Sequence, residues 1–136
     1  LLKKWTIKRE INAKILIQKL SIIPELRIPI PPPNIKHAWY KFYCYIDKKY
    51  LLSDWSRDRI VEEIVSMGYP AFQGSCSELY NEKCFRNNNL SNFQILPVAK
   101  NLVETSLMFL VHPTISSLKM KRYSEIIFKV IKRAIK

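Results

Sequence analysis

HAWYKFYCYID, residues 37–47, is the stretch on which the fold class of this chain depends. Two sets of side chains alternate along it, and both contain aromatic residues: Ala38, Tyr40, Phe42, Cys44 and Ile46 against His37, Trp39, Lys41, Tyr43 and Tyr45. Successive side chains of a β-strand point to opposite faces, and aromatic residues are enriched in strands. We therefore expect a strand here, with both of its faces at least partly covered.

The segment before this strand has the spacing of a helix followed by a connector. Over residues 1–20, apolar positions recur every three or four residues and so share one helical face. They are Leu2, Trp5, Ala13, Leu16, Ile17 and Leu20. Pro24 and the run RIPIPPP then exclude helix, because proline lacks an amide donor and disfavours helix in the residue before it.

SDWSRDRIVEEIVSMG, residues 53–68, predicts a second helix after the strand. Ser53 or Asp54 can cap its start, and Gly68 suits a left-handed cap at its end. Its apolar residues are Ile60, Ile64, Val65 and Met67. Its charged residues are Glu62 and Glu63 beside Arg57 and Arg59, which we interpret as solvated ion pairs.

The rest of the chain adds short elements and a long last helix. Residues 69–73 predict a short strand, residues 78–85 a short helix capped by Ser75 or Ser77, and residues 86–92 a polar loop. Pro97 opens another helix, and the apolar run 107–111 predicts a buried strand ended by Pro113. The last helix begins at Ser116 or Ser117 and has one apolar stripe, made of Tyr123, Ile127, Val130 and Ile131.

The order of the predicted elements is helix, strand, helix, strand, helix, strand, helix, without an internal repeat. At 136 residues the chain has the size of one domain, and its 48% hydrophobic content is enough for a core. We therefore expect a single α+β domain over residues 1–136. It has two layers, a small antiparallel or mixed sheet with helices on one side.

The net charge of +12 is concentrated at the two ends of the chain. The basic residues of the first segment face only Glu10, and those of the last helix face only Glu125. Both segments indicate amphipathic helices with solvated polar faces, and the sequence contains no recognised nucleic-acid module. A small basic module that binds a polyanion such as nucleic acid stays open as an alternative, because a large positive charge attracts such partners.

Cysteine content and hydropathy indicate a reduced, cytoplasmic protein. Cys44, Cys76 and Cys84 are odd in number, and they lack the spacing of a common zinc motif. No apolar run approaches the ~18 residues that span a bilayer, and no signal peptide opens the chain. The chain begins LLKKW without a methionine, so we expect it to be a piece of a longer protein.

GYPAFQGSCSELYNEKCF, residues 68–85, is the candidate stretch for chemistry. A nucleophile elbow needs a glycine on both sides of the nucleophile, and the pattern fails after Cys76. Cys76 as a nucleophile would need His37 or His112 as its base, and the sequence alone places neither near it. A metal site from these residues and Cys84 has suitable ligand types but no close pair. We favour serines that cap the next helix.

Four segments, taken together, resemble a known family. They are R-x-x-N-A at Arg9, Asn12 and Ala13, the strand HAWYKFYCYI, the helix SRDRIVEEIVSMG followed by YPAFQGSCSELYNEKCF, and LPVAKNLVETSLMFLVHPTIS. In this order and spacing they resemble the C-terminal part of the DegT/DnrJ/StrS-type sugar-nucleotide aminotransferases, especially the branch with a G-S-C-S-E loop. The resemblance covers nearly the whole chain.

The resemblance implies part of a fold type I aminotransferase, which uses pyridoxal phosphate to move an amino group, usually from glutamate, onto a nucleotide-linked keto sugar. In the family, a lysine shortly before a G-E-G-G stretch holds the cofactor. This chain has no such stretch. We therefore expect it to bind no cofactor and to be inactive alone. Its partners in the parent enzyme are a large N-terminal domain and a homodimer mate.

The resemblance also implies that this small C-terminal domain helps to wall the substrate cleft. Carried over residue by residue, the cleft candidates are His37, Tyr40, Gly74, Ser75, Cys76, Ser77 and Glu78. In many relatives the loop reads H-Y-x-P-x-H, whereas here it is QGSCSELY, so the residue that contacts the nucleotide sugar stays open. An isolated small domain exposes apolar surface, and we expect it to self-associate. A remnant of a split or decayed gene, with the fold but no role, is a third alternative.

Overall fold

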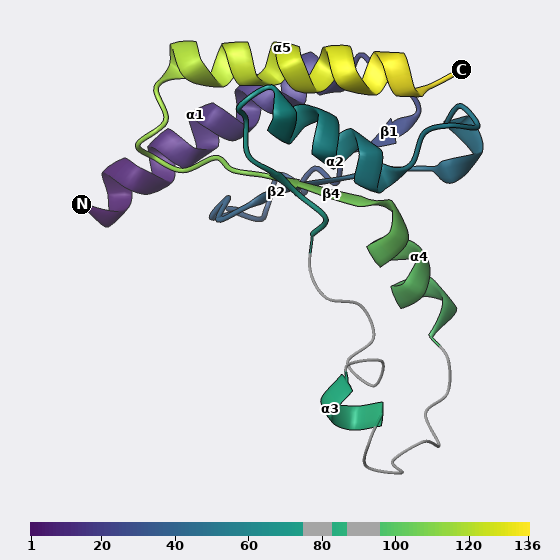
Figure 1. The fold of residues 1–136 in the computed structure, drawn as a ribbon. Coiled ribbons are helices and arrows are strands. Elements are labelled where there is room, and N and C mark those ends of the chain that lie inside the picture. The colour runs from purple at the N-terminus through teal and green to yellow at the C-terminus, as the bar shows by residue number, and fades with distance from the viewer. Residues whose placement is uncertain (75–82, 87–95) are drawn as a thin grey trace.

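Four short antiparallel strands form the sheet at the centre of the fold (Figure 1). The computed structural model describes residues 1–74, 83–86 and 96–136. Within them the strands are β1 (Leu26–Arg27), β2 (Phe42–Ile46), β3 (Ala71–Phe72) and β4 (Ser106–Phe109). Their order in the sheet is β1-β2-β4-β3, with Phe42 opposite Phe109 at one end of the central pair. The expected α+β class is confirmed, and the sheet is antiparallel rather than mixed.

The strand predicted over residues 37–47 is shorter than expected. β2 is Phe42–Ile46, and the prediction is wrong for residues 37–41 and for Asp47, which are not strand. The reason is Trp39, whose φ of 48° interrupts the extended backbone. Along β2 itself, alternate side chains from Phe42 to Ile46 are buried, and the two tyrosines between them are half-buried. Both faces of the strand are therefore partly covered, as predicted.

Three helices cover one face of the sheet (Figure 1): α1 (Leu2–Leu20), α2 (Arg57–Ser66) and α5 (Ser117–Ala134). The core lies between these helices and the sheet, and its fully buried members include Leu16, Leu20, Ile60, Ile64, Phe109, Tyr123, Ile127, Val130 and Ile131. This confirms the predicted layer of helices on one side. No helix in the described ranges has the length and apolar character needed to cross a membrane.

α1 is buried only over its second half. Ala13, Leu16 and Leu20 have no exposed surface, whereas Leu2 and Trp5 on the first turns are largely exposed. Asn12 is also fully buried, and its Nδ2 donates hydrogen bonds to the carbonyls of His112 and Ile115 at 3.0 and 3.2 Å. The asparagine of the R-x-x-N-A segment therefore joins α1 to the turn before α5.

α2 starts later than the sequence predicts. Its cap is Ser56, whose Oγ accepts a hydrogen bond of 3.1 Å from the amide of Arg59, so the assignment to Ser53 or Asp54 is wrong. Gly68, with a φ of 82°, has the left-handed conformation expected after the helix. Ile60 and Ile64 are the buried residues of α2. Val65 and Met67 face solvent, contrary to expectation, because the helix covers the sheet with one narrow stripe.

The remaining elements occur where they were predicted, but β3 and β4 are shorter than the strands predicted over residues 69–73 and 107–111, and β4 begins one residue earlier. Pro97 opens α4 (Pro97–Thr105), which leads directly into β4 and extends away from the other helices (Figure 1). The cap of α5 is Ser116, and the predicted apolar stripe of this helix is buried. α3 (Lys83–Arg86) is the described end of the helix predicted over residues 78–85, and the rest of that prediction lies outside the described residues. The short β1 and the 3₁₀-helix η1 (Lys48–Tyr50) were not predicted.

Candidate functional site

α4 leads into β4 and extends away from the three covering helices, and we call this end of the sheet its α4 end (Figure 1). Tyr43 and Tyr45 of β2 are half-buried on the face opposite the core, because Cys44 between them points into the core. Two features occupy this end of the molecule. One is a tight junction around Gly74, and the other is a groove beside α4.

Gly74 follows β3 and lies against Ser106, the first residue of β4. Its φ of +99° is in the left-handed region, which favours glycine. A Cβ at this position would be 2.5 Å from Oγ of Ser106 and 3.1 Å from its Cβ. The Ser106 hydroxyl donates a hydrogen bond of 2.5 Å to the carbonyl of Gln73. Both the backbone conformation and the close approach of β4 therefore require glycine here.

Arg57 ties this junction to α2 and to the end of α4. Only 10% of its side chain is exposed. Its Nη1 donates hydrogen bonds to the carbonyls of Gln73 at 2.9 Å, Val103 at 2.6 Å and Ser106 at 3.0 Å. Its Nε lies 2.6 Å from Oδ1 of Asp58, and Nε2 of Gln73 donates to the same oxygen at 2.8 Å. We refer to Arg57, Gln73, Gly74, Val103 and Ser106 as the Arg57 junction.

The prediction that Arg57 forms a solvated ion pair with the glutamates of α2 is wrong. The neighbouring Arg59 does behave as predicted, since it is half-exposed beside Glu63 at 3.9 Å and Asp54 at 2.8 Å. One signal in the sequence could have distinguished the two arginines. Arg57 is the first residue of α2, where the helix dipole disfavours a positive charge, so a basic residue there suggests bonds outside the helix.

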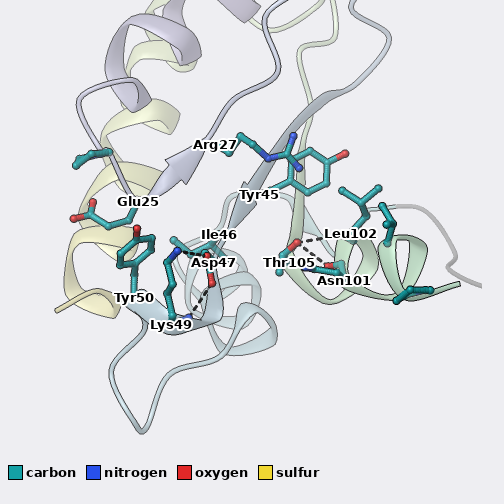
Figure 2. A pocket seen from close by; sticks show the side chains of 13 residues that line it. Glu25, Arg27, Tyr45, Ile46, Asp47, Lys49, Tyr50, Asn101, Leu102 and Thr105 are labelled. Carbon is teal, nitrogen blue, oxygen red and sulfur yellow. Dashed lines mark hydrogen bonds and ion pairs between the residues drawn. The ribbon is translucent and has the colours of Figure 1, made fainter.

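A groove of about 530 Å³ separates α4 from the ends of β1 and β2 (Figure 2). The α4 wall is one helical stripe, formed by Val98, Asn101, Leu102 and Thr105. The opposite wall and the floor include Glu25, Arg27, Tyr45, Asp47, Lys49 and Tyr50. The sequence analysis missed this groove because β1 and η1, which form one side of it, were not predicted.

Most charged groups around the groove neutralise one another. The backbone amide of Lys49 donates a hydrogen bond to Asp47, and its ammonium lies 3.0 Å from the same carboxylate. These contacts lower the pKa of Asp47 and raise that of Lys49. In a neighbouring depression on the other side of Asp47, Lys48 pairs with Glu104 at 2.7 Å and lowers the pKa of that carboxyl group. Figure 2 shows the stacked pair of Arg27 and Tyr45 on the other side.

His37 and Tyr40 lie before β2, at the opposite end of the sheet from Gly74. β2 and β3 both run antiparallel to β4, so they are parallel to each other, and Phe42 and Ala71 share Phe109 as their register partner. Tyr40 precedes that level by two residues and Gly74 follows it by three. The two residues therefore lie beyond opposite ends of the paired stretch of β2 and β3. The structure does not bring these predicted cleft residues together.

The other predicted site residues have local roles or lie outside the described part of the chain. Nδ1 of His37 accepts a hydrogen bond of 3.0 Å from the amide of Trp39, and the side chain of Tyr40 is largely exposed. Nδ1 of His112 lies 2.8 Å from Oγ1 of Thr114. The remaining cleft candidates, Ser75, Cys76, Ser77 and Glu78, lie outside the described residues.

Cysteine and metal chemistry have little basis in the described residues. Cys44 is fully buried in the core, and burial raises the pKa of its thiol, which keeps it protonated and unreactive. Residues 1–74, 83–86 and 96–136 contain no group of three histidines, cysteines or acidic residues that could hold a metal ion. Cys76, one of the residues considered for a metal site, is outside these ranges.

Comparison with known proteins finds similar solved structures. No protein-family model and no curated protein matches it. An aminotransferase from Psychrobacter cryohalolentis matches 98% of this chain and 36% of its own, with 40% sequence identity and a TM-score of 0.89. A DegT DnrJ EryC1 StrS aminotransferase from Brucella abortus matches 90% of this chain and 30% of its own, with 17% identity and a TM-score of 0.69. The chain matches a fragment of the DegT/DnrJ/StrS-type aminotransferases.

The chain spans about one third of the length of the relatives it matches. The same fold occurs in the Escherichia coli GDP-4-keto-6-deoxy-D-mannose-3-dehydratase with bound hydrated PLP, which matches 92% of this chain and 31% of its own. Its identity is 18% and its TM-score 0.72, so the likeness is one of fold. The fold alone therefore does not decide between amino transfer and dehydration.

The lysines of this chain do not fit the role of cofactor anchor. Pyridoxal phosphate is held by a lysine whose amine must lose its proton, and burial in an apolar site favours this loss. All the lysines lie within the described ranges, and none of them is buried. In the groove, Lys49 is exposed and paired with Asp47. No step of transamination can therefore be assigned to a lysine of this chain.

Proposed function

We propose that residues 1–136 are the C-terminal small domain of a pyridoxal-phosphate-dependent aminotransferase that acts on a nucleotide-linked keto sugar. In this role the domain walls part of the substrate cleft and is inactive alone. Its partners are the large cofactor-binding domain, the homodimer mate and the nucleotide-sugar substrate. The observation that carries the proposal is the 40% identity to the Psychrobacter aminotransferase over 98% of the chain.

The Arg57 junction gives a physical basis for the cleft-wall role. It fixes Gly74, the one loop candidate that the structure describes, against β4 and α4 through hydrogen bonds from Arg57 and Ser106. A cleft wall must hold its contacting groups to within a fraction of an ångström, and buried charge-assisted hydrogen bonds provide that rigidity. On this proposal, His37 and Tyr40 contact a different part of the cleft or a different partner, because they lie at the other end of the sheet.

Exposed apolar side chains support a partner surface. Leu2, Trp5, Ile7 and Ile11 are exposed on α1, and Val98 is largely exposed on α4. Exposed apolar surface of this kind is typical of protein interfaces. We expect the large domain or the dimer mate to cover part of it in the parent enzyme, and the isolated chain to self-associate. The comparisons give no support to the alternative of a polyanion-binding module.

A chimaera tests this function. The third of the Psychrobacter aminotransferase that matches this chain is replaced by residues 1–136. We expect the chimaera to retain pyridoxal phosphate through dialysis and to accept an amino group from L-glutamate, seen as a change in cofactor absorbance. The matched control is the Psychrobacter protein truncated before this third, which should lose the transfer.

Two results would contradict the proposal. One is a chimaera that folds and keeps the cofactor, yet transfers the amino group no faster than the truncated control. It would show that residues 1–136 cannot serve as the C-terminal domain of an active aminotransferase. A cofactor band that survives dialysis of the 136-residue chain alone would contradict its inactivity as a separate domain.

A further inference from the structure

We propose that the outer side of α1 and α5 binds the surface of a lipid bilayer that contains anionic lipids. Both helices belong to the layer that covers one face of the sheet, and their outer side is the side away from it (Figure 1). We call this surface the basic outer face and define it by Ile7, Ile11, Leu118, Arg122, Lys129 and Lys132. The inference goes beyond the proposed aminotransferase role and does not rest on it, because it needs neither a cofactor nor a nucleotide sugar.

One stripe of α5 forms the larger part of the basic outer face. Its members recur at intervals of three or four residues, so they lie along one line of the helix. They are Leu118, Arg122, Glu125, Lys129 and Lys132, and all of them are exposed. The opposite side of α5 carries the buried apolar stripe of this helix, so the exposed stripe is turned away from the sheet.

α1 runs beside α5 in the same layer. Nζ of Lys8 donates a hydrogen bond of 2.8 Å to Oγ of Ser117 at the start of α5. Further along both helices, Nζ of Lys19 lies 2.7 Å from the carboxylate of Glu125. The two contacts follow one another in the same order along both helices, so α1 and α5 run side by side in the same direction. Their outer sides therefore form one surface.

Ile7 and Ile11 lie on the outer side of α1, unlike the other exposed apolar residues of this helix. Leu2 and Trp5 are in line with Leu16, so they continue the buried stripe beyond the buried half of the helix and suit a contact with another domain. Ile7 and Ile11 are four residues apart on the opposite side, and both are exposed. A partner that covers Leu2 and Trp5 therefore leaves these two isoleucines to a different contact.

The cations of the basic outer face lack acidic partners. Arg122, Lys129 and Lys132 make no ion pair within the part of the chain that the structure describes. Glu125 is the only acidic residue of α5, and it is already paired with Lys19. Like charges along one helical stripe repel one another, and an anionic partner relieves that repulsion. The face therefore attracts a surface of many negative charges.

The apolar side chains among these cations favour a bilayer over a nucleic acid. Ile7, Ile11 and Leu118 would gain little from contact with a charged sugar–phosphate backbone. At a bilayer, by contrast, apolar side chains enter the boundary between headgroups and acyl chains while Lys and Arg contact anionic headgroups. A helix surface that combines both kinds of residue is typical of proteins that lie on membranes.

Co-sedimentation of the 136-residue chain with vesicles tests the proposal. The probes are vesicles of phosphatidylcholine alone and vesicles of phosphatidylcholine mixed with an equal amount of phosphatidylglycerol. We expect binding to the mixed vesicles to be about tenfold tighter or more, because each cation near an anionic surface adds to the attraction. Added salt should weaken this binding without abolishing it, because salt screens charges and leaves the apolar contribution in place.

A double variant tests the contribution of charge. Lys129→Gln combined with Lys132→Gln should weaken binding to the mixed vesicles about tenfold. The matched control is Lys41→Gln combined with Lys100→Gln, which removes the same charge before β2 and on α4, outside the helix layer. It should change binding by less than about twofold, because distant charges are screened.

A single variant tests the apolar contribution. Leu118→Ser should weaken binding about fivefold, because it removes an exposed apolar side chain from the face. The matched control is Ile35→Ser, since Ile35 is similarly exposed but lies in the connector between β1 and β2. It should leave binding unchanged. Circular dichroism shows whether each variant is folded.

Three results would overturn the proposal. The first is equal binding to both kinds of vesicle, or binding to neither. The second is a folded charge variant or a folded Leu118→Ser chain that binds like its control. The third is duplex DNA bound as tightly as the mixed vesicles at the same salt, with no effect of Leu118→Ser, which would assign the face to a nucleic acid.

Discussion

The helix-covered side of the sheet and its α4 end are held together by different interactions. Between α1, α5 and the sheet, the contacts are made by fully buried apolar side chains such as Leu16, Phe109 and Ile127. At the α4 end, the Arg57 junction depends on hydrogen bonds to three backbone carbonyls, and the groove beside it stays open.

This difference indicates which of the two regions should tolerate conservative substitutions. Apolar burial is non-directional, so its free energy depends on area and volume, and a neighbour of similar size can replace a side chain. Hydrogen bonds to fixed carbonyls require one donor at one position, and a lost donor leaves its buried acceptors without partners. The two regions should therefore respond differently to conservative and non-conservative changes.

The largest effect is expected in the core. Phe109→Ala should lower the free energy of unfolding by about 3–5 kcal/mol, because Phe109 is fully buried and packs edge-to-face on Tyr123. Chemical denaturation measures it. Phe72→Ala is the control, since Phe72 is 43% exposed on the neighbouring strand. Equal losses for the two phenylalanines would contradict the view that burial on the helical side dominates stability.

Arg57→Ala should cost about 2–3 kcal/mol, because it removes charge-assisted hydrogen bonds and leaves carbonyls of Gln73, Val103 and Ser106 without their donor. Arg57→Lys should recover little of this, because an ammonium group cannot reproduce the planar guanidinium. Hydrogen exchange should accelerate around Gly74. The control Arg59→Ala breaks only half-exposed pairs and should cost less than about 1 kcal/mol.

The two glycines provide a matched pair for the next effect. Gly68→Ala should cost about 1 kcal/mol, from left-handed backbone alone, since nothing lies within 4 Å of its added Cβ. Gly74→Ala should cost clearly more, because its Cβ would meet Ser106. In a double-mutant cycle, Ser106→Gly should relieve the excess at position 74 and leave position 68 unaffected. An equal loss of unfolding free energy in the two variants would show that β4 can move away from position 74 without cost.

The smallest effect is expected from the pair between Lys48 and Glu104. The hydrogen bond from Lys48 lowers the folded-state pKa of Glu104 below its ordinary value, so the pair contributes stability above the unfolded-state pKa and loses it as the pH falls through the folded-state pKa. Glu104→Gln should lower Tm slightly at neutral pH and not at acidic pH. Lys48→Met should remove that pH dependence. A Tm difference that persists in acid would exclude the ion pair as its cause.

The sequence predicted the core better than the site. The stripe from Tyr123 to Ile131 on α5 and the buried residues of β2 follow from periodicity, because a helix or strand must turn its apolar side chains toward the same layer. By contrast, the contacts of Arg57 are 16 to 49 residues apart in the chain, which no local pattern encodes. Trp39 ended the strand early through a single backbone angle.

By itself the sequence determined the class of the fold, the layer of helices over one side of a sheet, and the likeness to a family whose lysine motif it lacks. Only the tertiary structure decided that Arg57 is a buried link rather than a surface charge, that Gly74 must be glycine, and that Arg27 and Glu25 line one groove. The physical reason is the separation along the chain over which each interaction acts. Hydrophobic periodicity acts over neighbouring turns, whereas a directional hydrogen bond depends on where distant segments meet.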